Sequence, residues 1–156
     1  MALVATSVVQ QSYTAAAAIA GGSGLQVDDL SVLASVTETH VFSPLSAAVV
    51  ITTATHARFA LPYACVITGV QFGVATAPST ASISFDVKAA TVSVFTTLPT
   101  IEVGEFTTST SAIPGVLSNT AGVAVAANAE IAISAVLGTS TLTAGETVTI
   151  QLRRTS

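Results

Sequence analysis

The chain has eight Asp and Glu residues and two His residues that could do acid–base chemistry. Among the carboxylates, Glu102 and Glu105 are spaced closely enough to be considered as a catalytic pair. Glycoside hydrolysis needs two carboxyl groups that face one another across a cleft. Residues three apart on an extended strand point to opposite faces, and Gly104 favours a turn between them. We therefore predict solvated turn acids and no catalytic pair. Asp86 and Lys88 lie two apart on a predicted strand, and we expect them to pair on the surface.

The chain contains two histidines, His40 and His56. Neither belongs to a closely spaced metal-ligand motif such as HExxH. Glu38 and His40 are two apart, so one strand could supply two ligands and His56 a third, as in a cupin-type site. The alternative that we favour is a pair of polar or interface histidines, so no metal site is predicted.

Cys65 is the only cysteine, which excludes a disulfide within the chain. It lies in the apolar run 64–67, which predicts a buried thiol, and no group close in the sequence would lower its pKa. The chain has no Gly-x-Ser-x-Gly elbow and no Gly-rich phosphate loop. We predict that the protein is not an enzyme and has no catalytic residue and no cofactor.

The charge content argues against a nucleic-acid partner, and the hydropathy pattern argues against a membrane partner. Charged residues make up 8% of the chain and hydrophobic residues 51%, whereas ordinary soluble domains have about 25% charged residues. Four Lys and Arg residues and a net charge of −4 cannot provide the cationic face that a nucleic acid needs. No uninterrupted apolar span of about 20 residues is present, so no membrane partner is predicted. A surface this poor in charge is covered by hydroxyl groups or meets another protein.

The elements that would position these residues are β-strands. Apolar residues alternate with polar or small ones, which puts one set of side chains on a buried face. This alternation predicts strands at residues 39–42, 47–52, 56–61, 65–75, 82–88, 91–97, 131–136 and 148–152. About eight strands with turns between them indicate an all-β, antiparallel β-sandwich of the jelly-roll type.

The connections carry recognisable turn signals. We predict turns at 77–79, 103–105, 128–130 and 144–146, and a loop at 107–119 that contains Pro114-Gly115. Gly69 and Gly73 predict a bulge or bend. The connection at Ala89-Ala90 lacks the Asn-Gly signature of a tight hairpin.

We divide the chain into an N-terminal extended arm, residues 1–37, and a jelly-roll domain, residues 38–156. The arm has no charge before Asp28. It is expected to dock as an added strand on its own domain or on a neighbour. Arg153 and Arg154 end the chain after the last predicted strand, as a solvated tail or as an anchor to an acidic neighbour such as Asp28-Asp29. The candidate partner contacts are Leu3, Val4, Val8, Val9, Tyr13, Asp28, Asp29, Arg153 and Arg154.

Four stretches carry a resemblance to a known family. They are 67–72 (ITGVQF), 75–87 (ATAPSTASISFDV), 93–101 (SVFTTLPTI) with Gly104-Glu105, and 144–150 (AGETVTI). In this order they resemble a family of bacteriophage virion proteins, over residues 66–152. The chain departs from the family at Ala89-Ala90, where related sequences often carry an Asn/Gly-type turn. The resemblance implies a small jelly roll on the phage particle and provides no catalytic residue.

The function that we predict is that of a capsid cement or decoration protein on the outer surface of the virion. It would bind the major capsid protein and sister subunits, as a homotrimer, and stabilise the assembled head. The first alternative is a tail or fibre component that binds host receptors, which the absence of heptads and shaft repeats disfavours. The second is a carbohydrate-binding or cupin-like enzyme domain, which the absence of Trp and an aromatic content of 5% disfavour.

Overall fold

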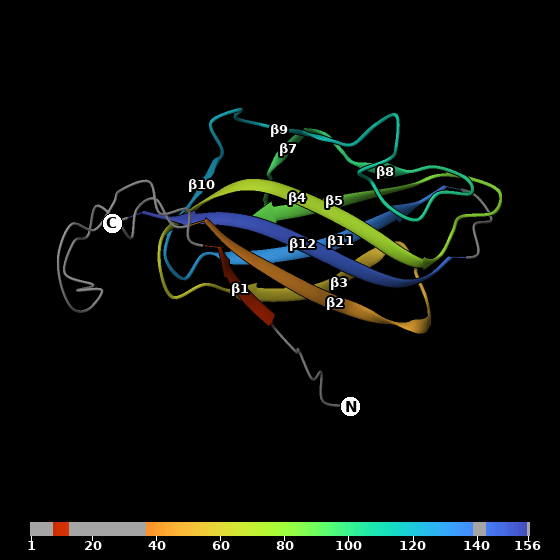
Figure 1. Ribbon diagram of the computed structural model, residues 1–156, viewed down its shortest axis with the longest axis horizontal. Helices are drawn as coiled ribbons and strands as arrows, with labels where there is room; N and C mark the ends of the chain where they lie inside the picture. The colour runs from red at the N-terminus through yellow and green to blue at the C-terminus, as the bar shows by residue number, and fades with distance from the viewer. Residues whose placement is uncertain (1–7, 13–36, 139–142, 156) are drawn as a thin grey trace, which may run out of the picture.

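The computed structural model describes residues 8–12, 37–138 and 143–155 (Figure 1). These residues form an all-β structure in which every strand pairing is antiparallel, and no helix occurs among them. Within this part of the chain no helix could therefore cross a membrane. The strands are β1 (Val8–Ser12), β2 (Thr37–Val50), β3 (Ala54–Ala60), β4 (Cys65–Thr76), β5 (Ile83–Ala89), β6 (Val92–Ser93), β7 (Phe95–Thr97), β8 (Thr100–Ile101), β9 (Val116–Leu117), β10 (Val123–Val125), β11 (Glu130–Leu137) and β12 (Ala144–Arg154).

The strands form two large sheets and one small one. The first sheet has the order β1-β2-β12-β4-β10. The second has the order β3-β11-β5-β6, and β8 pairs with the other end of β5. Strands β7 and β9 pair separately. Figure 1 shows the long strands β2, β4 and β12 of the first sheet running beside β3, β5 and β11 of the second.

The two large sheets share one hydrophobic core. Period-two alternation in β12 turns Val148, Ile150 and Leu152 to the buried face, and β5 and β11 do the same with their apolar residues. Phe72 of β4 stacks on Phe85 of β5, with the ring centroids 4.6 Å apart. Such a contact between the sheets fixes their separation, and each fully buried apolar side chain contributes about 1.5–3 kcal/mol.

Strand β2 corrects the prediction of two strands at 39–42 and 47–52. It is continuous through Pro44, and its register against β12 shifts between Phe42↔Val148 and Leu45↔Glu146. The bulge accommodates a proline because the extra residue need not donate to the ladder. The prediction of a turn at 144–146 is also wrong, because these residues lie inside β12.

The hairpin after β5 is a tight two-residue turn despite its sequence. Ala89 pairs with Val92, and the two residues between them have positive φ, +47° at Ala90 and +76° at Thr91. Two central residues in this region define a type I′ turn, which usually carries Asn-Gly. The predicted strand 91–97 divides into β6 and β7, which pair with different partners.

The predicted turns near Gly104 and Asn128 are confirmed, although Glu130 already belongs to β11, whereas 77–79 is an irregular connection. Glu105 N–H donates to the Glu102 carbonyl at 3.0 Å, and Gly104 between them has φ +83°. Asn128 has φ +60° just before β11. The 107–119 segment is loop except for the short β9. Strand β4 carries the expected bulge, where its register against β12 shifts near Gly69.

Part of the predicted arm is a strand of the same chain. Strand β1 pairs with β2 in the register Val8↔Val41 to Ser12↔Thr37, at the edge of the first sheet. This is the added-strand alternative for residues 8–12. Residues 1–7 and 13–36 lie outside the described part of the chain.

Candidate functional site: two glutamate–histidine clusters

Two clusters of polar side chains lie on the buried face of the first sheet, at its opposite ends. Glu38 and His40 of β2 are buried, and Glu38 is in register with Leu152 of β12. Glu146 of β12 is also buried and is in register with Leu45. Six residues of β12 separate these two positions, about 20 Å at the usual rise of a strand. Each cluster contains one histidine bound to one glutamate.

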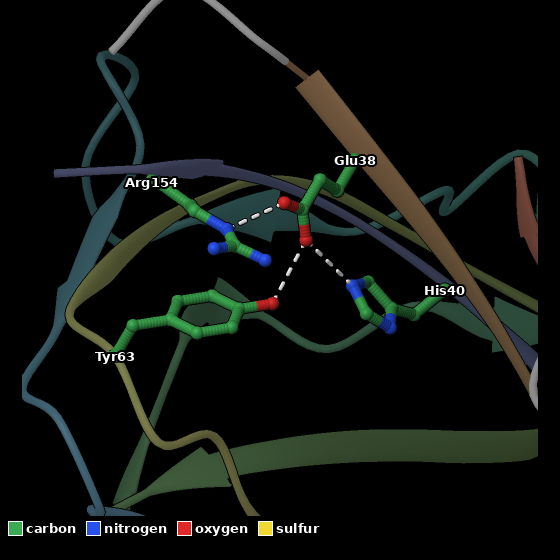
Figure 2. Close-up of polar contacts among 4 residues, drawn as sticks. All are labelled: Glu38, His40, Tyr63 and Arg154. Atoms are coloured by element: carbon green, nitrogen blue, oxygen red, sulfur yellow. Dashed lines mark hydrogen bonds and ion pairs between the residues drawn. The ribbon is translucent and has the colours of Figure 1, made fainter. Parts of the chain in front are cut away.

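The first cluster is built around the Glu38 carboxylate (Figure 2). One oxygen, Oε2, accepts from the Tyr63 hydroxyl at 2.8 Å and contacts His40 Nε2 at 3.1 Å. The other, Oε1, accepts from Arg154 Nε at 2.6 Å. The Arg154 guanidinium also lies over the Tyr63 ring, 3.9 Å from its centroid. The cluster thereby ties together β2, β12 and the segment between β3 and β4.

The electrostatics of this cluster favour one fixed protonation state. Burial opposes ionisation of Glu38, but the hydrogen bonds from its three partners outweigh it and lower the pKa of the carboxyl below its ordinary value. Burial and the hydrogen bond to this carboxylate raise the pKa of Tyr63 to about 12. A general acid or base works best with a pKa near the operating pH. Neither group meets that condition, so the geometry indicates a structural contact.

Cys65 lies at the start of β4 and is 1% exposed, which confirms the prediction of a buried thiol. Burial, with a further contribution from the negative charge of Glu38, raises the pKa of this thiol. The thiolate is the nucleophilic form of cysteine. This environment therefore works against nucleophilic chemistry at Cys65.

The second cluster joins the two sheets. His56 of β3 contacts Oε2 of Glu146 through Nδ1, and its Nε2–H donates to the Thr52 carbonyl at 2.9 Å. The second carboxyl oxygen, Oε1 of Glu146, is buried and has no hydrogen-bond partner among the described residues. Burial raises the pKa of Glu146, and the contact with His56 only partly offsets this effect.

A bulge in β3 gives His56 its position. Ile133 of β11 is in register with Ala57, and Ser134 is in register with Thr55, so His56 is the extra residue. A bulge re-aims the side chain that it carries. Sequence reasoning missed Glu146 because it assigned 144–146 to a turn. The signal was present, since Glu146 continues the buried alternation of Val148 and Ile150.

The two histidines do not come together. His40 binds Glu38 and His56 binds Glu146, so the cupin-type ligand set of Glu38, His40 and His56 is not assembled. Among the described residues no group of three or more His, Cys, Asp or Glu side chains is placed to hold a metal ion. Asp86 does not form the expected surface pair with Lys88; it is buried and accepts from the Ser93 hydroxyl at 2.6 Å.

The predicted partner-contact residues are only partly described. Arg153 and Arg154 lie within β12, which corrects their placement after the last strand, and Arg154 binds Glu38. Val8 and Val9 lie in β1. The remaining candidates lie outside the described residues: Leu3, Val4, Tyr13, Asp28 and Asp29. The last two are the acidic anchor proposed for Arg153 and Arg154.

A hollow of about 360 Å³ lies over β2, β4 and β12. Its lining is mostly small or hydroxyl-bearing, with glycines at 73 and 145. Glu146 is the only titratable residue in the lining, and its side chain is fully buried against His56. The hollow therefore presents no solvent-accessible acid or base that a substrate could meet.

Comparisons of the chain with models of protein families, with curated proteins and with solved structures find no match.

Proposed function

We propose that the domain is a jelly roll. Without β1 and the short strands β6, β7 and β9, the two large sheets have the orders β2-β12-β4-β10 and β3-β11-β5-β8. Consecutive strands alternate between the sheets from β2 to β5 and again from β10 to β12. This nesting, in which the first strand lies beside the last, corresponds to two Greek keys of eight strands. The proposal refines the all-β, antiparallel arrangement described above.

The proposed function is structural: the protein is a capsid cement or decoration protein that binds the assembled phage head. Its chemistry-bearing side chains support this proposal. The Glu38 and Glu146 carboxyls are bound to partners within the chain, and so are both imidazoles. Groups engaged in this way hold the domain together and are not free to act on a substrate.

The observation that carries the proposal is the apolar character of the connection between β8 and β9. This connection, residues 102–115, has no charged residue after Glu105. Phe106 is 55% exposed, and Val103 and Ile113 are also exposed. Val116, the first residue of β9, adds a further exposed apolar side chain. Four of the eight exposed large hydrophobic side chains among the described residues therefore lie in or next to this connection. An exposed apolar patch is the kind of surface that meets another protein.

The mechanism is mass action. A protein that binds the assembled shell and not its separated subunits stabilises the shell by its binding free energy. Repetition of the same contact over the many equivalent positions of a capsid multiplies a modest affinity per site. A homotrimer that contacts several capsid subunits at once gains further from multivalency.

Fractionation of purified particles into heads and tails tests the proposal, with copy number measured by quantitative mass spectrometry. We expect this protein in the head fraction at on the order of hundreds of copies, and a higher melting temperature for heads that carry it. A dozen copies or fewer, or absence from particles, would overturn the proposal. Recovery in the tail fraction with inhibition of host adsorption would favour the tail or fibre alternative. The solution mass of the purified protein tests the trimer.

A further inference from the structure

A buried polar contact joins the two sheets near the turn between β2 and β3. The His56 side chain is 4% exposed and the Glu146 side chain is fully buried. Taking a charged group out of water is costly unless a well-placed partner compensates. The protonation of this pair therefore bears directly on how the sheets hold together.

The geometry fixes the number of protons in the contact. The Thr52 carbonyl can only accept, so the 2.9 Å contact places a hydrogen on His56 Nε2. His56 Nδ1 then faces Glu146 Oε2 with one dissociable proton between them. The pair is either imidazolium with carboxylate or neutral imidazole with carboxylic acid. Both forms carry one proton and no net charge.

We propose that His56 and Glu146 share one proton and so form a contact between the two sheets, which we call a one-proton latch. The latch stabilises the domain over a band of pH, and this stabilisation is lost on both the acid and the alkaline side of the band. A second proton leaves a buried net positive charge. Loss of the shared proton leaves a buried carboxylate facing the lone pair of Nδ1. Oε1 of Glu146 has no partner among the described residues, so nothing in that part of the chain compensates the carboxylate.

The other titratable groups on the surrounding elements are placed away from the pair or bound to partners of their own. Arg58 of β3 and Glu130 of β11 are exposed and bind each other, while Lys88 of β5 is exposed. Asp86 of β5 alternates with the inward-facing Phe85 and binds Ser93. Glu105 lies on the opposite side of β4 from β12, next to Phe106, whose carbonyl accepts from Val74 N–H. It is half-buried and its Oε2 has no hydrogen-bond partner among the described residues, which corrects the prediction of a solvated turn acid. The titratable residues of β2, β4 and β12 other than Glu146 lie toward the far end of the first sheet: Glu38, His40, Cys65, Arg153 and Arg154.

Proton linkage sets the shape of the pH dependence. In the unfolded chain Glu titrates near pH 4.3 and His near pH 6.5, so the two residues together hold one proton between about pH 4.3 and pH 6.5. The closed latch also holds one proton, so its contribution is level in this band. Above the band the unfolded chain binds fewer protons than the native one, so rising pH favours unfolding. Below it the unfolded chain binds more, so falling pH favours unfolding.

The raised pKa of Glu146 has the sign that the alkaline side requires. A carboxyl whose folded pKa lies above its unfolded value retains its proton in the native state, and this stabilisation is lost as the pH rises through the folded value. Each proton of difference changes the unfolding equilibrium constant by about tenfold per pH unit.

The test compares the full chain with its Glu146→Gln variant in urea titrations across the pH range. The amide N–H of Gln can donate permanently to His56 Nδ1 and so replaces the shared proton. We expect the unfolding constant of the unmodified chain to rise with pH above about 6.5 by about tenfold per unit more than that of E146Q. Glu130→Gln makes the same chemical change at an exposed site and should follow the unmodified chain.

Equal slopes for the unmodified chain and E146Q above pH 6.5 would overturn the latch. If E146Q fails to fold, nitrogen-15 NMR of the unmodified chain decides the question. We expect His56 Nε2 to carry hydrogen at every pH where the protein is folded, and a hydrogen to lie between His56 Nδ1 and Glu146 at neutral pH. A His56 that lacks hydrogen on Nε2 at neutral pH, or that shares no hydrogen with Glu146 through Nδ1, would refute the proposal.

Discussion

The type I′ turn after β5 offers a sharp test, because a β-branched residue occupies its second central position. Thr91 has φ +76°, in the left-handed region where an L-residue costs roughly 1–2 kcal/mol relative to ordinary backbone. Glycine adopts this region without that cost, but it loses about 0.5–1 kcal/mol through the greater freedom of the unfolded chain. The difference predicts that Thr91→Gly stabilises the protein by up to about 1 kcal/mol.

Thr91→Ala is the matched control, because alanine removes the hydroxyl and methyl groups but keeps the Cβ that makes positive φ unfavourable. Thr91 is exposed, so neither variant opens a cavity. The assay is urea unfolding followed by circular dichroism, supported by the melting temperature, which should rise by about 2–4 °C per kcal/mol in a protein of this size. A Thr91→Gly variant no more stable than Thr91→Ala would refute the argument from backbone strain.

Three further predictions follow from other parts of the fold. The pKa of Glu38 is lowered, so its contribution to stability is present above its unfolded value of about 4.3 and is lost as the pH falls through the folded value. Glu38→Gln should therefore flatten the acid side of the stability profile measured by urea titration. Gly122 has φ +101°, and a Cβ there would lie 2.4 Å from Val66 Cγ1. Gly122→Ala should therefore lower the free energy of unfolding by more than about 1 kcal/mol in the same assay. An unchanged free energy of unfolding would contradict this packing. The Cys65 thiol should react with a thiol-specific disulfide reagent only after denaturant is added, and rapid labelling of the native protein would show that it is accessible.

The sequence predicted the all-β class and most strands because period-two alternation is a local property. The buried faces of β5, β11 and β12 follow from it directly. Other features depend on partners distant in the sequence. Pro44 was interpreted as a break between strands, but a bulge opposite β12 keeps β2 continuous. The tight turn at Ala90-Thr91 forms because β5 and β6 are held in register, against the local preference of both turn residues.

The candidate site was the least predictable part. Glu38 and His40 are two apart on one strand, so their contact could be anticipated from spacing alone. Tyr63 and Arg154 join them from positions 25 and 116 residues away from Glu38, which no local pattern indicates. His56 and Glu146 are 90 residues apart, and a bulge that only the β3–β11 register reveals gives His56 its position.

The position of β12 inside the first sheet has a consequence for synthesis of the chain. Strand β12 separates β2 from β4, and its pairing joins Arg153 to Thr37 across almost the whole domain. Until the ribosome has released residues 144–154, the first sheet lacks its middle strand, and β2 and β4 have open edges facing an empty position. Domains dominated by such long-range pairings fold slowly, and incomplete sheets are prone to aggregation. We expect nascent chains that stop before β12 to depend on chaperones, and the first sheet to close only after residues 144–154 have left the ribosome.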